Sequence, residues 1–373
     1  MNVLVAPDSF KGSLTAVRAA GIIAESIVRC DPAARCVLLP QADGGEGTLA
    51  VLESQRGGTR HTVAACDPLG RRLEADWLLL PDGTAVIESA DVIGFTLLDD
   101  AERNPAQLRS TGLGSMLRAV TRHGAQQVLI ALGGSATNDA GLGFAEAMGY
   151  AFHYDTDPGR DVFRALRTLR GIDASRAGGT PPVTVLADVR NPLCGPRGAT
   201  AVYGPQKGVQ AGQLERVDHA VAHFATIVRR DVRFVDSAAA GMGAAGGLGF
   251  ALSAFCGARL RPGADVVRAM TGFTEALAGC DLVITGEGRL DAQSREGKVV
   301  AGIAAEARSR GVPVVAFAGE IAGSSAWLAE ALGLRAAIRV TPEDVSTDDG
   351  MRRADALLSA AVSAFWQDFP GTR

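Results

Sequence analysis

The sequence predicts an α/β protein: a doubly wound, Rossmann-like domain with a parallel sheet, and a smaller mixed α+β domain inserted into it. Short apolar runs, each followed by a glycine-bearing loop and an amphipathic segment, recur along the chain and indicate strand–loop–helix units. Between these units lie β-like runs separated by tight turns, too close together for crossover helices. The length of 373 residues favours two domains over one.

The strand–loop–helix pattern appears in residues 2–29, 36–54, 126–150 and 280–311. The last of these is followed by a further apolar strand, "VPVVAFAG". Within the first, Ser13 is a plausible N-cap. The apolar residues after it recur at helical spacing: Val17, Ala20, Ile23, Ala24 and Ile27. Loops at the carboxyl ends of parallel strands line the ligand crevice, so we expect functional residues in these loops.

The inserted domain is predicted from two stretches with a different pattern. Residues 61–89 contain three β-like runs separated by the turn sequences "DPLG" and "PDG", which is typical of antiparallel hairpins. Residues 181–208 also indicate strand and turn, without room for a crossover helix. We therefore expect a discontinuous Rossmann-like domain of residues 1–60, 105–150 and 270–373, and an inserted domain of residues 61–104 and 151–269.

The composition excludes several classes of function. A net charge of −4 argues against a nucleic-acid or acidic-membrane partner held by bulk charge. The six cysteines form neither a C-x-x-C pair nor a zinc spacing, which suits a reducing cytoplasm, and the N-terminus lacks the basic start of a signal peptide. The uncharged stretch 237–258 is mostly Gly and Ala, so we interpret it as a glycine-rich loop entering a buried helix rather than as a membrane span.

Glycine-rich loops with acidic or hydroxyl side chains are the strongest functional signal. Glycine lets the backbone approach a ligand closely and present its N–H groups to an anion. A single loop of this kind is more often an ordinary tight turn, but several that follow apolar strands favour a binding site. The loops are "ADGGEGT" (42–48), "GGSATNDAG" (133–141), "GAAGGLG" (243–249) and "TGEGRLD" (285–291).

Several well-known motifs are absent from the sequence. It contains no Walker sequence, no G-x-S-x-G, and no G-x-G-x-x-G after the first strand, where "APDSFKGS" stands instead. His219 and His223 have the spacing of helical metal ligands but lack the glutamate of a zinc protease, so we interpret them as part of a solvated helix face.

Lysine is rare in this chain. Only three of the 37 Lys and Arg residues are lysine, and each of the three, Lys11, Lys207 and Lys298, stands next to a glycine. Arginine clamps an anion with a planar fork, whereas the compact ammonium of lysine fits inside a ring of backbone groups. We therefore expect these lysines to face phosphoryl oxygens; chance survival in surface turns is the alternative.

Acidic residues complete a pattern suited to phosphoryl transfer, which uses Mg²⁺ on phosphate oxygens and a carboxylate that orients the attacking hydroxyl. Any of them can instead cap a helix or form a turn, Asp43 and Asp139 above all. They lie at predicted strand ends or in the glycine loops: Asp8, Asp43, Glu46, Asp139, Asp188, Glu287 and Asp291.

Six motifs, taken in order, resemble the bacterial glycerate kinase family: "APDSFKGS", "ADGGEGT", "GGSATNDAG", "DVRNPLCGPRGATAVYGPQKG", "GAAGGLG" and "LVITGEGRLDAQSREGK". The resemblance implies a two-domain α/β fold with the site between the domains. It also implies ATP-dependent phosphorylation of D-glycerate, assisted by Mg²⁺, to 2-phosphoglycerate or 3-phosphoglycerate. The sequence departs from the family pattern at Ala140, where glycine is usual, and at Ala187 and Ser294.

Within this resemblance we assign roles by chemistry. Catalysis is assigned to Lys11, Asp188 and Lys207. Phosphate or nucleotide binding is assigned to Gly133, Gly134, Ser135, Asn138, Glu287 and Gly288. Substrate binding is assigned to Asp8, Ser9, Arg190, Asn191, Arg289 and Asp291, and the Mg²⁺ site to Asp43 and Glu46.

The alternative function is a non-catalytic sensor that binds an acidic metabolite on the same scaffold. A nicotinamide dehydrogenase for a 2-hydroxy acid is a third hypothesis, disfavoured by the missing G-x-G-x-x-G. The leading hypothesis is a cytoplasmic kinase, monomeric or homodimeric, whose partners are D-glycerate and ATP, with no nucleic-acid or membrane partner.

Overall fold

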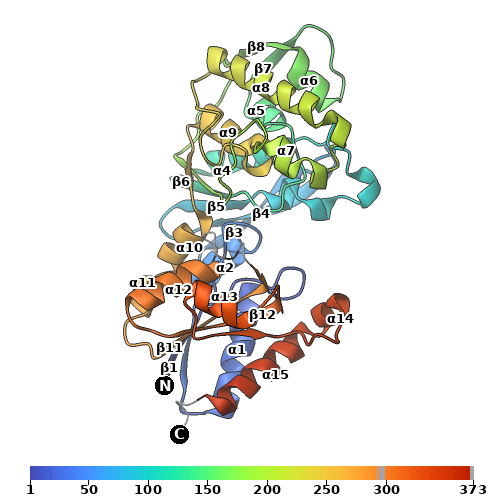
Figure 1. The fold of residues 1–373 in the computed structure, drawn as a ribbon. Coiled ribbons are helices and arrows are strands. Elements are labelled where there is room, and N and C mark those ends of the chain that lie inside the picture. The colour runs from blue at the N-terminus through green and yellow to red at the C-terminus, as the bar shows by residue number, and fades with distance from the viewer. Residues whose placement is uncertain (292–293, 295–298, 370–373) are drawn as a thin grey trace. The chain divides into compact units, whose positions relative to one another are not determined.

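A computed structural model describes residues 1–291, 294 and 299–369, and the contacts of the chain divide it into two compact units (Figure 1). Unit 1 comprises Met1–Asp43, Ala50–Arg56 and Ala264–Arg373, and unit 2 comprises Gly44–Leu49 and Gly57–Gly263. Lys298, which the sequence singled out, lies outside the described residues.

Unit 1 is built on a parallel sheet which, in the described part of the chain, has the order β13-β12-β11-β1-β2. The chain progresses from β1 to β2 on one side and from β11 through β12 to β13 on the other, so the direction of winding reverses between β1 and β11. In a doubly wound sheet, this reversal opens a crevice at the carboxyl ends of the two central strands. The strands are β1 (Asn2–Val5), β2 (Arg35–Leu38), β11 (Leu282–Leu290), β12 (Val314–Ile321) and β13 (Ala336–Arg339).

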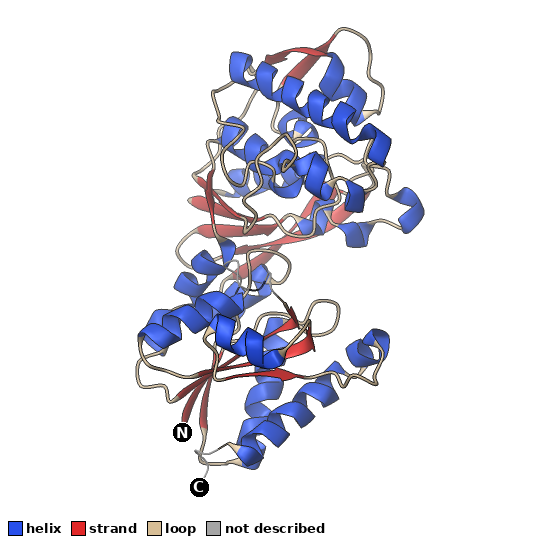
Figure 2. Cartoon of the chain, viewed as in Figure 1, coloured by secondary structure: helices blue, strands red, loops and turns tan. Residues whose placement is uncertain are grey.

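Helices cover both faces of this sheet because successive strand residues point to opposite sides. Val3 and Val5 belong to the core that includes residues of α1 and α15, whereas Leu4 belongs to the core that includes residues of α12 and α13. Figure 2 shows the strands of unit 1 with helices on either side, so the predicted doubly wound parallel sheet is confirmed. The helices are α1 (Ala16–Cys30), α2 (Thr48–Arg56), α10 (Gly263–Thr271), α11 (Phe273–Ala276), α12 (Val299–Ser309), α13 (Ser325–Leu332), α14 (Thr347–Arg352) and α15 (Ala354–Asp368).

The start of α1 differs from the expectation. Thr15 is the N-cap, with its hydroxyl accepting from the Arg18 N–H at 3.2 Å, whereas the Ser13 hydroxyl donates to the Phe10 carbonyl. Val17, expected on the buried face, is 39% exposed. Ala16 and Ala19 are buried, together with the other apolar residues expected on the buried face of this helix: Ala20, Ile23, Ala24 and Ile27.

Unit 2 is built on a mixed sheet whose order, among the described residues, is β10-β9-β6-β5-β4-β3. β3, β4 and β5 form the antiparallel meander predicted from residues 61–89, and β5, β6, β9 and β10 run parallel. A separate antiparallel pair joins β7 to β8. The strands are β3 (Thr59–Cys66), β4 (Arg72–Leu79), β5 (Thr84–Glu88), β6 (Gln127–Ala131), β7 (Ala151–Tyr154), β8 (Leu169–Asp173), β9 (Val183–Leu186) and β10 (Arg259–Arg261).

A single large apolar cluster joins this sheet to its helices. Ile87 and Ile130 of the strands, Leu117 of α4, Phe224 of α8 and Phe250 of α9 are all fully or almost fully buried in it. The helices and 3₁₀ turns of unit 2 are α3 (Ala90–Ile93), η1 (Phe95–Leu97), η2 (Asp100–Glu102), α4 (Thr111–His123), α5 (Leu142–Ala147), α6 (Val162–Thr168), α7 (Ala199–Tyr203), η3 (Pro205–Lys207), η4 (Ala211–Gln213), α8 (Leu214–Asp231) and α9 (Ala244–Cys256).

The membership of residues 105–150 differs from the expected boundaries. β6 pairs with β5 and β9, so these residues lie in unit 2, which is therefore the larger unit rather than a small insertion. A strand–loop–helix pattern is local, whereas the sheet that a strand joins depends on contacts distant in sequence, which the pattern does not contain.

Residues 181–208 also differ from the expected strand and turn. Only β9 is a strand there, and α7 and η3 follow it. Residues 237–258 form a glycine-rich turn leading into the buried helix α9, as we interpreted them. None of the helices in the described residues is long and apolar enough to cross a membrane.

Gly141 allows a direct test of the packing in unit 2. It has a φ of +76°, and a Cβ there would lie 2.1 Å from the Cβ of Ala251. Gly141→Ala should therefore lower the free energy of unfolding by about 2–4 kcal/mol, measured by chemical denaturation, because overpacking and left-handed backbone both carry a cost. Gly212→Ala is the control, since a Cβ at Gly212 meets no described atom within 4 Å. Equal stability of the two variants would contradict this packing.

Candidate active site

Unit 1 contains a cavity of about 240 Å³ at the carboxyl ends of β1 and β11, where the strand order reverses. Part of its lining is apolar or carries hydroxyl groups, including Phe10, Val340, Thr341 and Met351. The remainder is charged or glycine-rich. Many of the residues assigned from the sequence line this cavity: Asp8, Ser9, Lys11, Asp43, Glu287, Gly288 and Arg289.

Backbone contacts bring the two predicted loops of unit 1 side by side. The Asp8 N–H donates to the Gly286 carbonyl at 2.8 Å, which extends the pairing of β1 with β11 and places Asp8 close to Glu287. Further along, a Cβ at Gly288 would lie 3.1 Å from the backbone nitrogen of Lys11. The glycine therefore allows "TGEGRLD" to pass close to "APDSFKGS".

The charges in this cavity are strongly coupled. Lys11 Nζ lies 3.3 Å from Asp43 Oδ2, and the charges of Asp43 and Asp8 raise the pKa of Lys11. Burial, followed by repulsion from Asp43, raises the pKa of Asp8 to about 8, although the Ser9 N–H donates to its carboxyl group at 2.6 Å. Asp8 is thus largely protonated at neutral pH, whereas Lys11 carries a full positive charge.

In unit 2, glycine loops that are distant in sequence meet backbone to backbone. A Cβ at Gly133 would lie 2.5 Å from the Cα of Gly45, so the loops 42–48 and 133–141 touch where only glycine fits. A Cβ at Gly246 would lie 2.1 Å from the Thr137 carbonyl oxygen, which joins the loop 243–249 to the same place. Among the predicted glycine loops, "TGEGRLD" alone belongs wholly to unit 1.

Two buried carboxylates fix these loops. Glu88, at the end of β5, accepts from the N–H groups of Gly47 and Leu49 at 3.2 and 2.6 Å, and burial raises its pKa to about 7. Asp139 accepts from both the N–H and the hydroxyl of Ser110 at 2.8 Å. Asp139 therefore anchors its loop. This agrees with the alternative given above, in which Asp139 forms a turn and does not take part in phosphoryl transfer.

Lys207 is the buried cation of this loop cluster. It is 3% exposed, and its ammonium donates to Ser135 Oγ at 3.1 Å and to the Thr137 carbonyl at 2.7 Å. Burial lowers the pKa of Lys207 to about 7, against an opposing attraction from Asp139. Nearby, Thr137 Oγ1 and Asn138 Oδ1 are buried without a hydrogen-bond partner in the described part of the chain. Buried polar atoms of this kind are uncommon and are typical of ligand sites.

The residues predicted after β9 form hydrogen bonds within unit 2. Asp188 Oδ1 accepts from the Gly263 N–H at 2.7 Å. Asn191 donates to the Arg197 carbonyl at 2.8 Å and accepts from the Tyr203 hydroxyl at 2.6 Å. The side chain of Arg190 is exposed. The substrate and catalytic roles assigned to Asp188, Arg190 and Asn191 stay predictions.

The other predicted residues lie at different places. Asp291 lies 3.7 Å from the Nε of Arg289 and is not part of the cavity lining. Glu46 is exposed and belongs to unit 2, whereas Asp43 belongs to unit 1. Gly134, with a φ of +67°, lies beside Ser135.

Sequence reasoning missed residues in both units. Glu88 ends an apolar strand, which is a usable signal, but the strand was attributed to a hairpin domain. Thr137 lies inside a recognised loop, yet its burial cannot be inferred from spacing. Thr341 follows β13 and lines the cavity of unit 1, because it stands at the same edge of the sheet as Asp8.

The fold and the loops define an α/β protein with a cavity at the winding reversal of one parallel sheet and a buried lysine bound by Ser135 and Thr137 in the other unit. Proteins of this class commonly bind phosphate-bearing ligands. The model of the "Glycerate kinase family" matches residues 3–369. The chain therefore belongs to the glycerate kinase family and is a kinase.

Individual relatives agree with this assignment. The chain is 39% identical over 368 residues to a glycerate kinase of Halalkalibacterium halodurans. This match covers 97% of this chain and 96% of the relative. It is 38% identical over 331 residues to the glycerate 2-kinase of Escherichia coli K12, covering 86% of each. A crystal structure of a candidate glycerate kinase 2 from Salmonella typhimurium LT2 has a TM-score of 0.84 at 36% identity and covers 98% of this chain and 97% of that one. The resemblance and the fold class are confirmed.

The buried ammonium of Lys207 predicts a particular dependence of stability on pH. Because its pKa falls from 10.5 in the unfolded chain to about 7 on folding, the unfolded state binds more protons between these values, and the free energy of unfolding rises with pH across this window. The rise should be on the order of a few kcal/mol and should be lost in Lys207→Met, measured by urea denaturation from pH 6.5 to 10.

Arg18→Met is the control, since Arg18 forms an exposed ion pair with Asp355 and stays charged throughout this window. The same pH dependence in wild type and Lys207→Met would show that Lys207 is not a desolvated ammonium.

Proposed function

We propose that the protein transfers the γ-phosphoryl group of ATP to a hydroxyl of D-glycerate and forms 2-phosphoglycerate. The observation that carries this proposal is the buried Lys207 ammonium, which is held by Ser135 and the Thr137 carbonyl inside glycine loops. Such a point charge among backbone groups suits phosphoryl oxygens. The names of the relatives, glycerate kinase and glycerate 2-kinase, support the substrate and the position of transfer.

In unit 2, the loop 133–141 binds phosphate in this proposal. Gly133 and Gly134 supply backbone N–H groups for the phosphate, the Ser135 hydroxyl accepts from Lys207, and Asn138 lies in the same loop with its Oδ1 buried. The negative charge of a phosphate close to Lys207 stabilises its ammonium form. Phosphate binding therefore raises the pKa of Lys207, which burial had lowered. Lys207 thus stabilises negative charge that develops on the transferred group.

In unit 1, the cavity provides complementary groups for a small hydroxy acid or for phosphate. Lys11 neutralises a carboxylate or a phosphoryl oxygen, and Asp8 and Ser9 lie beside it in the lining of the cavity. Glu287, Gly288 and Arg289 complete this part of the proposed binding surface. Asp188 keeps its proposed role of orienting the hydroxyl that receives the phosphoryl group.

The carboxylates fit a magnesium ion that binds mainly through its nucleotide. Repulsion from Asp43 and Glu287 helps to raise the pKa of Asp8, and a cation relieves repulsion of this kind. In the part of the chain that the structure describes, no group of three His, Cys, Asp or Glu residues is placed to hold a metal alone. Asp43 would hold the ion together with phosphate oxygens and water, as is usual for Mg²⁺, which neutralises phosphate charge. Glu46 stays the second proposed ligand.

Mixing the protein with Mg-ATP and D-glycerate tests the proposal when ADP formation is coupled to an optical signal. We expect ADP formation that requires glycerate, and a Lys11→Met enzyme whose kcat/KM is lower by about 10²–10³-fold, the usual cost of losing one fixed charge stabiliser. Arg18→Met is the matched control and should keep wild-type activity. It removes an exposed arginine of α1 that pairs with Asp355 of α15.

Each alternative gives a distinct result in this assay. Saturable glycerate binding without ADP formation would favour the sensor, and reduction of NAD would favour the dehydrogenase. ³¹P and ¹³C NMR of the product identify the phosphorylated carbon, and a phosphate on C3 would contradict the proposed position. A fully active Lys11→Met enzyme would remove Lys11 from the catalytic residues.

A further inference from the structure

Residues 94–105 of unit 2 contact Ser135 and Gly208, the residue that directly follows Lys207. At one end, Gly94 forms a backbone bridge with Ser135, and the Phe95 N–H donates to the Gly134 carbonyl at 3.1 Å. At the other end, a Cβ at Gly208, directly after Lys207, would lie 2.5 Å from the Arg103 carbonyl oxygen. A displacement of this segment therefore changes the position of Ser135 relative to Lys207.

The segment contains neither an α-helix nor a strand, and its internal hydrogen bonds are those of two short turns, including a capping box between Asp99 and Glu102. It consists of the short 3₁₀ turns η1 and η2, joined by extended residues. Its apolar support is a small cluster in which Leu98 packs with Leu108 and Ala136. Polar contacts on its outer side therefore decide where it lies.

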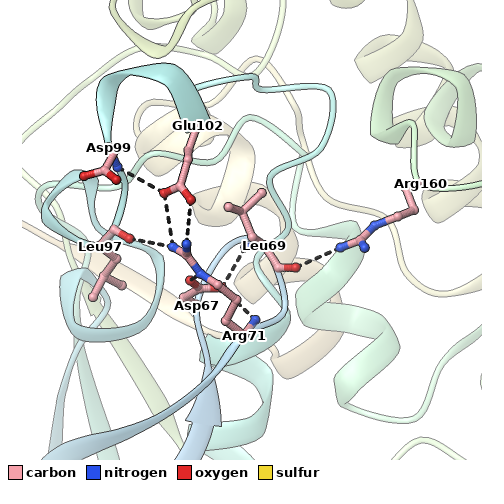
Figure 3. Close-up of polar contacts among 7 residues, drawn as sticks. All are labelled: Asp67, Leu69, Arg71, Leu97, Asp99, Glu102 and Arg160. Atoms are coloured by element: carbon pink, nitrogen blue, oxygen red, sulfur yellow. Dashed lines mark hydrogen bonds and ion pairs between the residues drawn. The ribbon is translucent and has the colours of Figure 1, made fainter.

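Arg71 provides these polar contacts, as Figure 3 shows. One guanidinium nitrogen donates to the Leu97 carbonyl at 2.9 Å, and two nitrogens bind the carboxylate of Glu102 at 2.6 and 3.2 Å. The same carboxylate also accepts from the Asp99 N–H at 3.1 Å, and this bond and Arg71 lower the pKa of Glu102. A single arginine thus fastens both 3₁₀ turns.

The opposite side of Arg71 is fixed to the turn between β3 and β4. Its Nε pairs with Asp67, whose side chain is only 6% exposed. Asp67 also accepts from the N–H groups of Leu69 and Arg71 at 2.9 and 2.8 Å, so the turn is rigid at this point. Arg160 donates to the Leu69 carbonyl at 2.8 Å from a third direction (Figure 3).

We propose that Arg71 is a positioning residue for the phosphate-binding loop: by clamping residues 94–105 to the β3–β4 turn, it sets the distance between Ser135 and Lys207. This proposal rests on the proposed function of that loop. The planar fork of arginine is required, because the clamp uses several nitrogens in different directions at once, which a lysine ammonium cannot reproduce.

Two measurements on Arg71→Met test the proposal. Hydrogen exchange, followed by mass spectrometry, should be faster in residues 131–141 than in wild type. The kcat/KM for Mg-ATP should fall by about 10- to 100-fold, with the KM raised, since small misplacements of binding groups carry costs of this size. Arg71→Lys should restore neither property.

Arg170→Met is the matched control, because Arg170 is an exposed arginine of unit 2 that pairs with Asp155 away from this segment. A lower melting temperature of Arg71→Met with wild-type exchange in 131–141 and wild-type KM would make Arg71 merely structural and overturn the proposal. If the wild-type protein forms no ADP with glycerate, the proposed function fails, and the exchange comparison still decides the role of Arg71.

Discussion

The ammonium of Lys207 is surrounded by protein and not by water, and the architecture around it follows from that constraint. An isolated buried cation is costly, so it needs oxygens at hydrogen-bond distance, which Ser135 and the Thr137 carbonyl supply. These oxygens reach it only because the loop 133–141 is folded tightly, and the loop is held by Asp139 and by close contact with Gly45 and Gly246. The glycines, the buried carboxylates and the lysine are therefore parts of one arrangement that favours an anionic ligand.

The sequence could predict the composition of this arrangement but not its assembly. The rarity of lysine pointed to Lys207 and Lys11, and both stand next to a glycine. The two differ in the structure, because Lys207 is buried whereas the side chain of Lys11 is 71% exposed and pairs with Asp43 at 3.3 Å in the cavity of unit 1. Spacing along the chain carries no information about such burial, since it depends on backbone contacts between residues far apart in sequence, such as Gly133 with Gly45.

The fold shows the same division between local and non-local information. The continuous apolar run Val3, Leu4 and Val5 predicts a strand covered on both faces. The structure confirms it, since Leu4 packs in one core and Val3 and Val5 in another. Which sheet receives β6 is decided by its pairing with β5 and β9, and the local pattern of residues 126–150 is compatible with either sheet. Ala140 has a φ of +51°, in the left-handed region that is strained for a residue with a Cβ, and the sequence pattern of its loop does not reveal this strain.

The state of Lys207 can be observed directly, because a chain with three lysines gives few signals when lysine is labelled with ¹⁵N at Nζ. In a pH titration followed by NMR, with assignment by Lys207→Met, one signal should titrate near pH 7, and Mg-ATP should move that titration toward the ordinary value of 10.5. Titration of every lysine signal near pH 10, with or without nucleotide, would contradict the account, since the buried ammonium would then be neither desolvated nor in contact with phosphate.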